Sequence, residues 1–585
     1  MKNISIILLA MLASFILIAC NDSSEIEDGD MEQGELDGDL DQEIAEIEYE
    51  IETDGDEELA EMDDLEAELE TEIEEDLNPW LPPRPASSLG FERPVREPSG
   101  VDPNAQEITD FTSKLTEFYK QSGYFDWVWR ISHGMDKSYD ADMMDYKLWW
   151  QDVGMRKEGD KVVFFHRGIA ENIAERTMKM LPNLIGGYLL TADERMANTA
   201  IQYMKGMVAL SKGMEFEREN PLVKYLQSRS VFNHNHSYVV DDRKIEIDYS
   251  ASKVASAKWN VHVFNIPDNP EYGDIWIANM RSKDDIPYMY QSMVMAARAY
   301  YESDNEELRA TALLYMEYIR GFCQSVVDND WYILTKYDDG EAVKMYDIDK
   351  ETRPEADLGS FVHWALVFGE KAECNAQLGA GLTAYGNSYE FGDCEMGLGG
   401  SLFENYVFAI HFFNYEIYNH FHIGAMAAAT LWGKTEIAEN LMIGMVDRFD
   451  RLMHDESISH RDDPDFDSAM AGWLLVAATH GYPLTADEAH HIMEWYTRSS
   501  DWYLKWPHWD PWNSLEDGES LYNDKAPRTE TIVSESGDEI KTGYIRLMEM
   551  PYIFEYCASK LRDKDGVQFV NCDVISDKAQ WGLAR

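Results

Sequence analysis

Two adjacent aspartates, Asp284 and Asp285, are the first candidates for acid–base chemistry. Cleavage of a glycosidic bond needs two carboxyl groups, separated by roughly 5–5.5 Å for retention of configuration or ~6.5–9.5 Å for inversion. Arg281 precedes them and would orient one carboxylate. A purely structural role fits as well, because Ser282 and Asp285 match a capping box and acids in a first turn favour the helix dipole.

A second candidate group precedes a helix rich in small residues. Glu416, His420 and His422 lie among aromatic residues, and a histidine can transfer a proton near neutral pH. Glu416 and His420 are four residues apart, so they share one face of a helix. The alternative is a set of hydrogen-bonded polar groups at a tightly packed helix start.

The densest aromatic run lies between residues 502 and 513 and contains Trp502, Trp506, Trp509 and Trp512. Two prolines within the run predict a loop. Flat rings on a loop suit stacking against the faces of sugars, so these tryptophans are candidate substrate-binding residues. The alternative is a loop whose rings plug the interior of the fold.

Three alternating acids, Asp463, Asp465 and Asp467, have the first spacings of a calcium-binding loop. The pattern fails at its sixth position, which is Ser468, and at its twelfth, which is Leu474. An EF-hand is therefore excluded. A looser Ca²⁺ site and a solvated acidic turn remain as interpretations, and we expect no other metal or cofactor.

Other chemistry finds little support. His234 and His236 have the spacing of two metal ligands on an extended segment, but no third ligand is evident. The sequence contains no Gly-x-Ser-x-Gly elbow, Walker loop, dinucleotide fingerprint or His-Glu-x-x-His motif. It therefore gives no support to a serine hydrolase, an ATPase or a zincin.

The strongly negative net charge limits the classes of molecule that this protein can bind. Asp and Glu outnumber Lys and Arg by 110 to 50 over 585 residues, a formal net charge of −60. Such a charge repels phosphate backbones and anionic lipids, which argues against nucleic acid and against electrostatic docking on membranes. The acid is concentrated, because residues 21–80 hold 29 Asp and Glu and neither Lys nor Arg.

The amino terminus has the features of an export signal. Lys2 is followed by an apolar or small-residue run from Ile4 to Ile18, shorter than the ~20 residues of a spanning helix and typical of a signal peptide. The run ends in Leu17-Ile18-Ala19-Cys20, which resembles the lipobox of bacterial lipoproteins. The resemblance implies cleavage before Cys20 and a lipid on it. Asn21 in place of Asp favours the outer membrane. An ordinary signal peptide with an incidental cysteine is the alternative.

Composition divides the chain into three parts. Residues 1–19 are the expected signal peptide. Residues 20–85 are acidic, repeat Asp-Gly-Asp and end in a proline-rich linker. Self-repulsion predicts a disordered tether that holds the body away from the envelope. Residues 86–585 are the expected folded domain, attached to the membrane only through the lipid.

Four cysteines flank two short loops, Cys374 with Cys394 and Cys557 with Cys572. An exported protein meets an oxidising environment, so both pairs are expected to form disulfides. Cys323 remains, within an apolar helical pattern, as a small buried residue.

Helical periodicity dominates from about residue 110. The expected helices, many of them paired across short turns, are 106–122, 169–186, 194–212, 285–303, 305–328, 357–372, 402–418, 420–432, 435–453, 467–480, 485–498 and 543–561. Short strands are expected between the pairs, on one rim of the helical body, at 237–248, 260–264, 275–278, 331–336 and 342–346.

One turn sequence occurs twice. Residues 187–194 (GYLLTADE) recur as residues 481–488 (GYPLTADE). In each copy Gly is expected to end one helix and Thr to cap the next, with Glu three residues later completing a capping box. The two copies indicate equivalent helical hairpins, or the same turn reached twice.

The stretch 281–332 carries a second resemblance. It consists of Arg-Ser-Lys-Asp-Asp, a helix to Tyr301, Asp-Asn-Glu-Glu-Leu-Arg, a second helix and Asp-Trp-Tyr. This resembles a repeat unit of six-hairpin toroids, many of which act on carbohydrates. The resemblance implies a mainly α fold, an (α/α) toroid-like array of helical hairpins with short β-hairpin excursions. A non-closed helical array is the alternative.

Together the two resemblances imply an envelope-anchored lipoprotein that binds glycan, and they leave open its cleavage by a glycoside hydrolase or polysaccharide lyase type of reaction. A carboxylate pair or a Tyr/His set would act as acid and base in an aromatic cleft. The expected partner is a polysaccharide or oligosaccharide. The alternative is a non-catalytic surface lipoprotein that serves as a binding or scaffold module.

Overall fold

The computed structural model divides the chain into two units, Met1–Asn78 and Pro79–Arg585, and only residues of the second are described below. The described residues are 81–82, 84–91, 95–97, 99–122, 153–166, 173–215, 225–232, 236–240, 243–248, 263–278, 286–328, 334–336, 342–344, 416–431, 435–454, 466–505, 516–522, 530–533 and 539–581. They are mainly helical, which confirms the expected fold class at that level.

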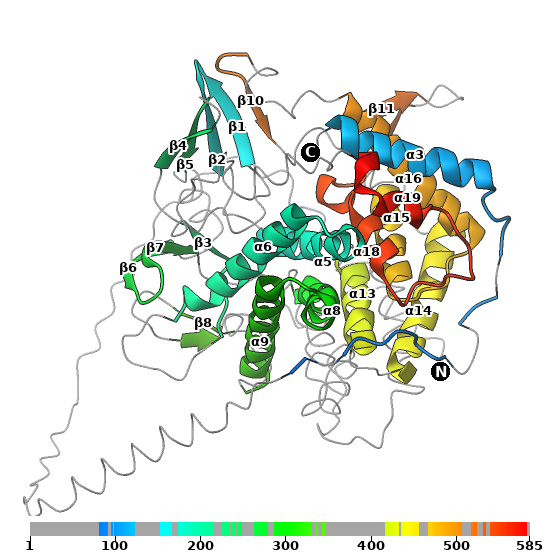
Figure 1. Cartoon of the computed structure of the whole chain (residues 1–585), viewed down its shortest axis with the longest axis horizontal. Coiled ribbons are helices and arrows are strands. Elements are labelled where there is room, and N and C mark those ends of the chain that lie inside the picture. The colour runs from blue at the N-terminus through cyan, green and yellow to red at the C-terminus, as the bar shows by residue number, and fades with distance from the viewer. Residues whose placement is uncertain are drawn as a thin grey trace, which may run out of the picture. The chain divides into compact units, whose positions relative to one another are not determined.

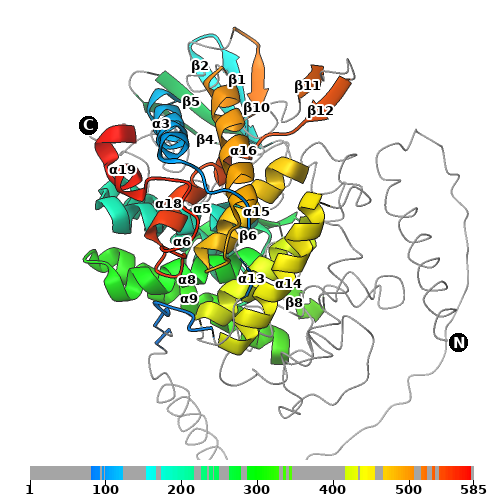
Figure 2. The same ribbon diagram turned by 90° about the vertical axis from the view of Figure 1, so that its right-hand side faces the viewer.

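Eight helices form four hairpins, each joined by a connection of two to six residues that brings its helices side by side. The pairs are α5 (Ile173–Thr191) with α6 (Glu194–Lys212), α8 (Ile286–Glu302) with α9 (Glu306–Asp328), α13 (Glu416–Leu431) with α14 (Thr435–His454), and α15 (Phe466–Thr479) with α16 (Ala486–Leu504). Figure 2 shows α13 beside α14 and α15 beside α16.

The remaining helical segments come from the two ends of the described chain. They are α3 (Ala105–Ser122), η5 (Leu547–Glu549), α18 (Tyr552–Ala558), α19 (Cys572–Ser576) and η6 (Lys578–Trp581). α3 lies against α16, and it also contacts α19 and η6 (Figure 1). The amino-terminal and carboxyl-terminal parts of the body are therefore packed together.

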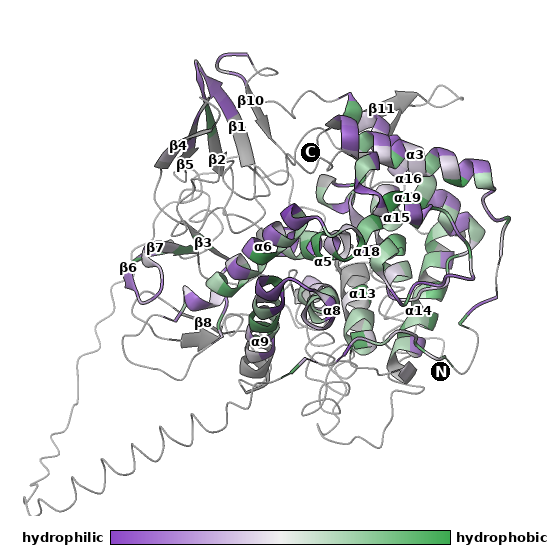
Figure 3. Cartoon of the chain, in the orientation of Figure 1, coloured by the Kyte–Doolittle hydropathy of each residue, from purple (hydrophilic) through white to green (hydrophobic). Residues whose placement is uncertain are grey.

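The core lies between the first helices of the hairpins. α5 contacts α8, α8 contacts α13, and α13 contacts α15, while α18 contacts both α15 and α5. α15 carries no charged residue after Asp467, and a helix that is apolar all round is a buried one. Figure 3 shows hydrophilic residues recurring along α3 and α6, whereas α18 is largely hydrophobic.

Every described strand lies in a connection before, between or after the hairpins. The bounds are β1 (Val153–Glu158), β2 (Lys161–His166), β3 (Ser230–Phe232), β4 (His236–Val240), β5 (Arg243–Asp248), β6 (Val263–Asn269), β7 (Gly273–Ala278), β8 (Leu334–Lys336), β9 (Ala342–Lys344), β10 (Ser520–Tyr522), β11 (Glu530–Val533) and β12 (Glu539–Thr542). The expected hairpins at 237–248 and 331–346 correspond to β4–β5 and β8–β9, and the strand at 275–278 lies within β7. The predicted strand 260–264 overlaps β6 only at residues 263 and 264, because β6 continues to Asn269.

One five-stranded sheet joins three of these connections. Its order is β10-β1-β2-β5-β4, with β2 parallel to β5 and the other pairs antiparallel. It therefore unites the chain before α5, the chain between α6 and α8, and the chain after α16. The other described sheets are β3-β7-β6, β8-β9 and β11-β12.

Several predicted helices have different bounds in the structure, among them 169–186, which is α5, and 485–498, which is α16. The predicted helices 402–418 and 420–432 do not separate near residue 419, because α13 runs without a break from Glu416. The predicted helix 543–561 is instead η5 followed by α18, with Pro551 between them. Proline has no amide hydrogen for a helical hydrogen bond, which explains the break. The predicted helix 357–372 lies outside the described residues.

The first copy of the repeated turn also differs from its prediction. α5 continues through Gly187 to Thr191, so that glycine does not end the helix. Asp193, not Thr191, is the N-cap of α6, and its carboxylate accepts a hydrogen bond from the Arg195 amide at 3.0 Å. The second copy follows the prediction, with Thr485 and Glu488 forming a capping box on α16.

A non-helical segment before α3 runs across the turns of the hairpins. The Tyr301 hydroxyl, at the end of α8, donates to the carbonyl of Pro82. Arg96 donates to the Tyr482 hydroxyl at 2.8 Å and to Glu488 at 2.7 Å, and Asp450 in α14 is a further partner. We call residues 81–104 the amino-terminal strap.

Candidate functional site

Most of the sequence-predicted site residues lie outside the described residues, so the structure does not place them together or apart. These are Cys20, His234, Arg281, Asp284, Asp285, Cys374, Cys394, Asp463, Asp465, Trp506, Trp509 and Trp512. Of His236, only the backbone, in β4, is described.

The backbone of α13 places the second candidate group. Glu416, His420 and His422 all belong to its first two turns, so Glu416 and His420 share a helix face as predicted. α13 lies against α8, and α8 begins at Ile286, directly after Asp285. The helix that begins with Glu416 therefore neighbours the helix that begins at Ile286.

Trp502 is not in a loop. α16 extends to Leu504, beyond the predicted end at residue 498, so Trp502 lies in its last turn. The ring stacks on Tyr544, with 4.8 Å between centroids and 20° between planes, and meets Tyr503 edge-on at 4.9 Å. One face of Trp502 is thus engaged by the protein itself.

The possible Ca²⁺ site is described only at Asp467. This residue is in the first turn of α15, and His491 Nε2 lies 2.9 Å from its backbone carbonyl. Within the described ranges, no group of three His, Cys, Asp or Glu side chains is arranged to hold a metal ion.

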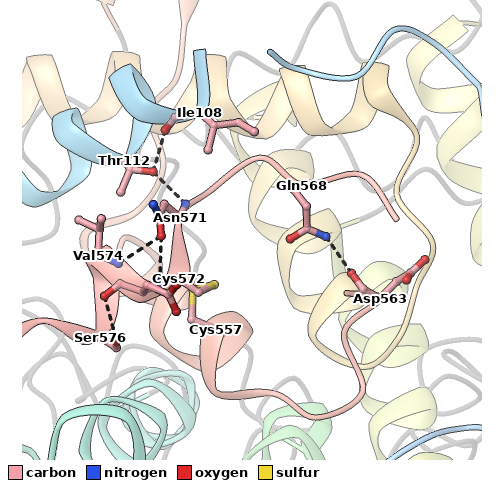
Figure 4. The surroundings of a disulfide bond; sticks show 10 residues. Ile108, Thr112, Cys557, Asp563, Gln568, Asn571, Cys572, Val574 and Ser576 are labelled. Carbon is pink, nitrogen blue, oxygen red and sulfur yellow. Dashed lines mark hydrogen bonds between the residues drawn. A yellow bond between two sulfur atoms is a disulfide. The ribbon is translucent and has the colours of Figure 1, made fainter. Parts of the chain in front are cut away.

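The predicted disulfide between Cys557 and Cys572 is present and ties α18 to α19. Figure 4 shows the bond and the hydrogen bonds around it. The side chain of Asn571 caps α19, and the backbone amide of Asn571 donates a hydrogen bond to Thr112 Oγ1 of α3 at 3.0 Å. The start of α19 is therefore held to α18 by the disulfide and to α3 by the hydrogen bond of Asn571.

A buried charge cluster that sequence reasoning missed lies where α5, α8 and η5 meet. Lys179 Nζ is 2.8 Å from Glu175 Oε1 and 3.2 Å from Glu549 Oε1, and its side chain is only 1% exposed. The Lys179 ammonium also lies 4.5 Å from the centre of the Tyr288 ring. Arg176 is 3.2 Å from Glu175. Two cations and two carboxylates balance, which is the condition for burying such charges.

A second buried polar group lies where α18 meets α8 and the end of α15. Gln291 Nε2 donates to Glu555 Oε2 at 3.1 Å, and His480 Nε2 is 3.9 Å from Glu555 Oε1. Burial raises the pKa of Glu555 to about 8, and the hydrogen bond from Gln291 only partly offsets it. Burial lowers the pKa of His480 to about 4. At pH 7 the two are a neutral acid and a neutral imidazole, and not an ion pair.

Both groups leave a faint trace in the sequence. Glu555 is the only charged residue of the seven in α18, and the only charged residues of the nineteen in α5 are Glu175, Arg176 and Lys179, all near its start. Isolated charges within apolar helices are expected to be partnered in the core, because an unpaired buried charge is very costly. The sequence does not identify those partners, which come from segments more than 250 residues away for Glu555 and Gln291.

In comparisons with known proteins, no family model, no curated protein and no solved structure matches the chain. Among the described residues, no helix is both long enough and apolar enough to cross a membrane.

Proposed function

We propose that this protein is a lipid-anchored lipoprotein of the bacterial envelope whose helical body is toroid-like and binds glycan. The proposal includes cleavage of that glycan by hydrolase or lyase chemistry. It places Cys20 as the lipid attachment site, residues 21–78 as the tether and the outer membrane as the location. The polymer recognised would be a polysaccharide or oligosaccharide.

The toroid is supported by the order of helix contacts. α5, α8, α13, α15 and α18 contact one another in chain order, and α18 returns to α5. Each of the first four is followed by a second helix that packs against it, and the second helices α6 and α9 also contact each other. A ring of hairpins has this pattern, whereas an open array would leave its first and last units apart.

The location of the site is supported by the five-stranded sheet, which is the observation that carries the proposal. This sheet joins the long connections around three hairpins, while the turns within the hairpins are short. Long connections held on a rigid scaffold are the usual carriers of binding and catalytic residues. The predicted residues Arg281, Asp284 and Asp285 belong to one such connection.

The starts of the inner helices supply the candidate chemistry. Glu416, His420 and His422 begin α13, Asp284 and Asp285 precede α8, and the first turns of α5 and α8 hold Glu175 and Tyr288. In the catalytic version, one carboxyl group protonates the leaving oxygen while a second group acts as base or nucleophile. Trp502 and the tryptophans after it would stack on sugar rings.

The test combines binding with chemistry. The full chain, purified in detergent, is incubated with a panel of neutral and acidic polysaccharides, and the solution is assayed for new reducing ends and for unsaturated products. Reducing ends alone indicate hydrolysis, and unsaturated ends indicate a lyase. Retention on an immobilised polysaccharide without products supports the alternative of a non-catalytic binding module. Absence of both binding and products rules out the glycan proposal.

Anchoring is tested separately. Replacing Cys20→Ala should abolish incorporation of a labelled fatty acid and release the protein from the membrane fraction. Unchanged labelling in the Cys20→Ala variant would contradict the lipoprotein assignment, and it would leave the glycan assay unaffected.

A further inference from the structure

The buried group formed by Glu555, Gln291 and His480 has no part in the proposed function. Glu555 is completely inaccessible, and His480 is 1% exposed. Glu555 receives one hydrogen bond, from Gln291, at its Oε2 atom. Its Oε1 atom and both ring nitrogens of His480 have no hydrogen-bond partner in the described part of the chain. The 3.9 Å between Oε1 and His480 Nε2 exceeds a hydrogen-bond distance.

Within the described ranges, the elements around this carboxyl group supply no free cation to it. On α5, Lys179 is held between Glu175 and Glu549; on α8, Arg298 donates to the carbonyl of Ala558 and pairs with Glu302 at 2.9 Å. The other titratable neighbours add no positive charge: Tyr496 of α16, Tyr552 of α18 and Glu549 of η5. On the far side of α18, Asp573 of α19 is exposed to solvent. A negative charge on Glu555 would therefore be buried without a counterion from the described part of the chain.

α18 is the element through which the helix contacts close. It touches α15 on one side and α5 on the other, and the disulfide at Cys557 fixes it to α19. With only seven residues, it cannot be stable as a helix by itself and depends on side-chain packing. Glu555 sits at the middle of this short helix, so its ionisation acts directly on the closure.

We propose that the junction of α18 with α8 and α15 is a pH-sensitive closure, held together while Glu555 carries its proton and opened locally when that proton is lost. Ionisation would place a charge with one hydrogen bond in an apolar interior, and opening lets water reach it. The disulfide keeps α18 attached to α19 during such an opening, so the change is local and reversible.

The sign of the pH effect follows from the two folded-state pKa values. Glu555 is raised from 4.5 to about 8, so its contribution to stability is complete below pH 4.5 and is lost as the pH rises through 8. His480 is lowered from 6.5 to about 4, so its contribution is complete above pH 6.5 and is lost as the pH falls through 4. Of these two groups, only Glu555 changes its contribution between pH 6.5 and 8, and this change lowers the free energy of unfolding as the pH rises.

The experiment measures unfolding of the oxidised full chain by denaturant between pH 6.5 and 8, for the natural sequence and for Glu555→Gln. The amide variant keeps the shape and the acceptor for Gln291 but cannot ionise. The unfolding equilibrium constant of the natural protein should rise by roughly tenfold per pH unit at most, as one released proton requires. In Glu555→Gln the side chain at position 555 cannot ionise, so it should change the unfolding equilibrium constant by less than about twofold over the same pH range.

Glu494→Gln is the matched control, because Glu494 is an exposed glutamate on α16 with a side chain 61% accessible. It should follow the natural protein at every pH. Amide exchange within residues 552–558 provides the local readout. After correction for intrinsic rates, it should accelerate between pH 6.5 and 8 in the natural protein and in Glu494→Gln, but not in Glu555→Gln.

Equal pH dependence in the natural protein and Glu555→Gln would overturn the proposal, as would unchanged exchange in residues 552–558. If Glu555→Gln does not fold, the number of protons released when the natural protein unfolds tests the proposal instead. Unfolding the natural protein at pH 7, in buffers of different ionisation enthalpy, should release most of one proton. Release of none contradicts a protonated buried Glu555.

Discussion

The turn at residues 187–194 and the turn at residues 481–488 differ at one position in eight, yet they have different structures. Position three is Leu189 in the first and Pro483 in the second. In the first, the helix continues past the glycine to Thr191. In the second, α15 ends at Thr479 and Gly481 adopts φ +100°.

The physical reason lies in that one residue. A proline disfavours helical backbone at the residue before it, and it cannot donate the helical hydrogen bond itself. Pro483 therefore stops the helix before Tyr482, whereas Leu189 lets it continue. The positive φ then falls on Gly481 in one copy and on Ala192 in the other, at φ 51°. A shared turn sequence consequently does not imply a shared turn.

Exchanging the differing residue should give the largest effect. Leu189→Pro removes a hydrogen bond from the last turn of α5 and brings the ring against the preceding turn, so it should destabilise the protein by about 3 kcal/mol. The reciprocal change, Pro483→Leu, should cost less than about 1 kcal/mol, because Gly481 and the strap still hold the turn. Denaturant unfolding of both variants measures the difference. Equal losses would show that position three does not determine the two structures.

The glutamate that ends each copy should show the next largest contrast. Glu488 is 2% exposed and accepts hydrogen bonds from Arg96 and the Tyr482 hydroxyl, whereas Glu194 is exposed and accepts a hydrogen bond from the Asn305 side chain at 3.2 Å. Glu488→Ala should cost about 2 kcal/mol, since Arg96 keeps Asp450 as a partner. Glu194→Ala should cost less than about 0.5 kcal/mol. Similar values for the pair, measured by chemical denaturation, would contradict this account.

The threonine of each copy should give the smallest contrast. Thr485 caps α16 by accepting from the Glu488 amide at 3.2 Å, and its loss should cost about 1 kcal/mol. Thr191 instead donates to the carbonyl of Gly187 at 2.6 Å within the last turn of α5. Thr191→Ala should therefore change the free energy of unfolding by less than about 0.5 kcal/mol. A larger loss for Thr191→Ala than for Thr485→Ala would reverse the assignment of the cap.

The helices were largely predictable because their signal is local. The bounds of α6 agree with the prediction, and those of α8 and α9 differ by one residue, since apolar periodicity and capping residues lie within the helices. β1 and β2 were not predicted, because their pairing with β5 and β10 depends on residues far along the chain.

The site was less predictable than the fold. The pairing of Cys557 with Cys572 follows from a short loop and an oxidising compartment, and it is present. The contacts of Glu555 with Gln291, and of Lys179 with Glu549, depend on which helices become neighbours. Only the tertiary arrangement determines that.

The amino-terminal strap has a mechanical consequence. Tension on the first 80 residues would reach the folded body at the Tyr301 contacts of Pro82 and Arg84, and then at Arg96 with its partners in α14 and α16. Because these partners belong to α8, α14 and α16, a pull on the strap would be shared among three helices of the body and not carried by one.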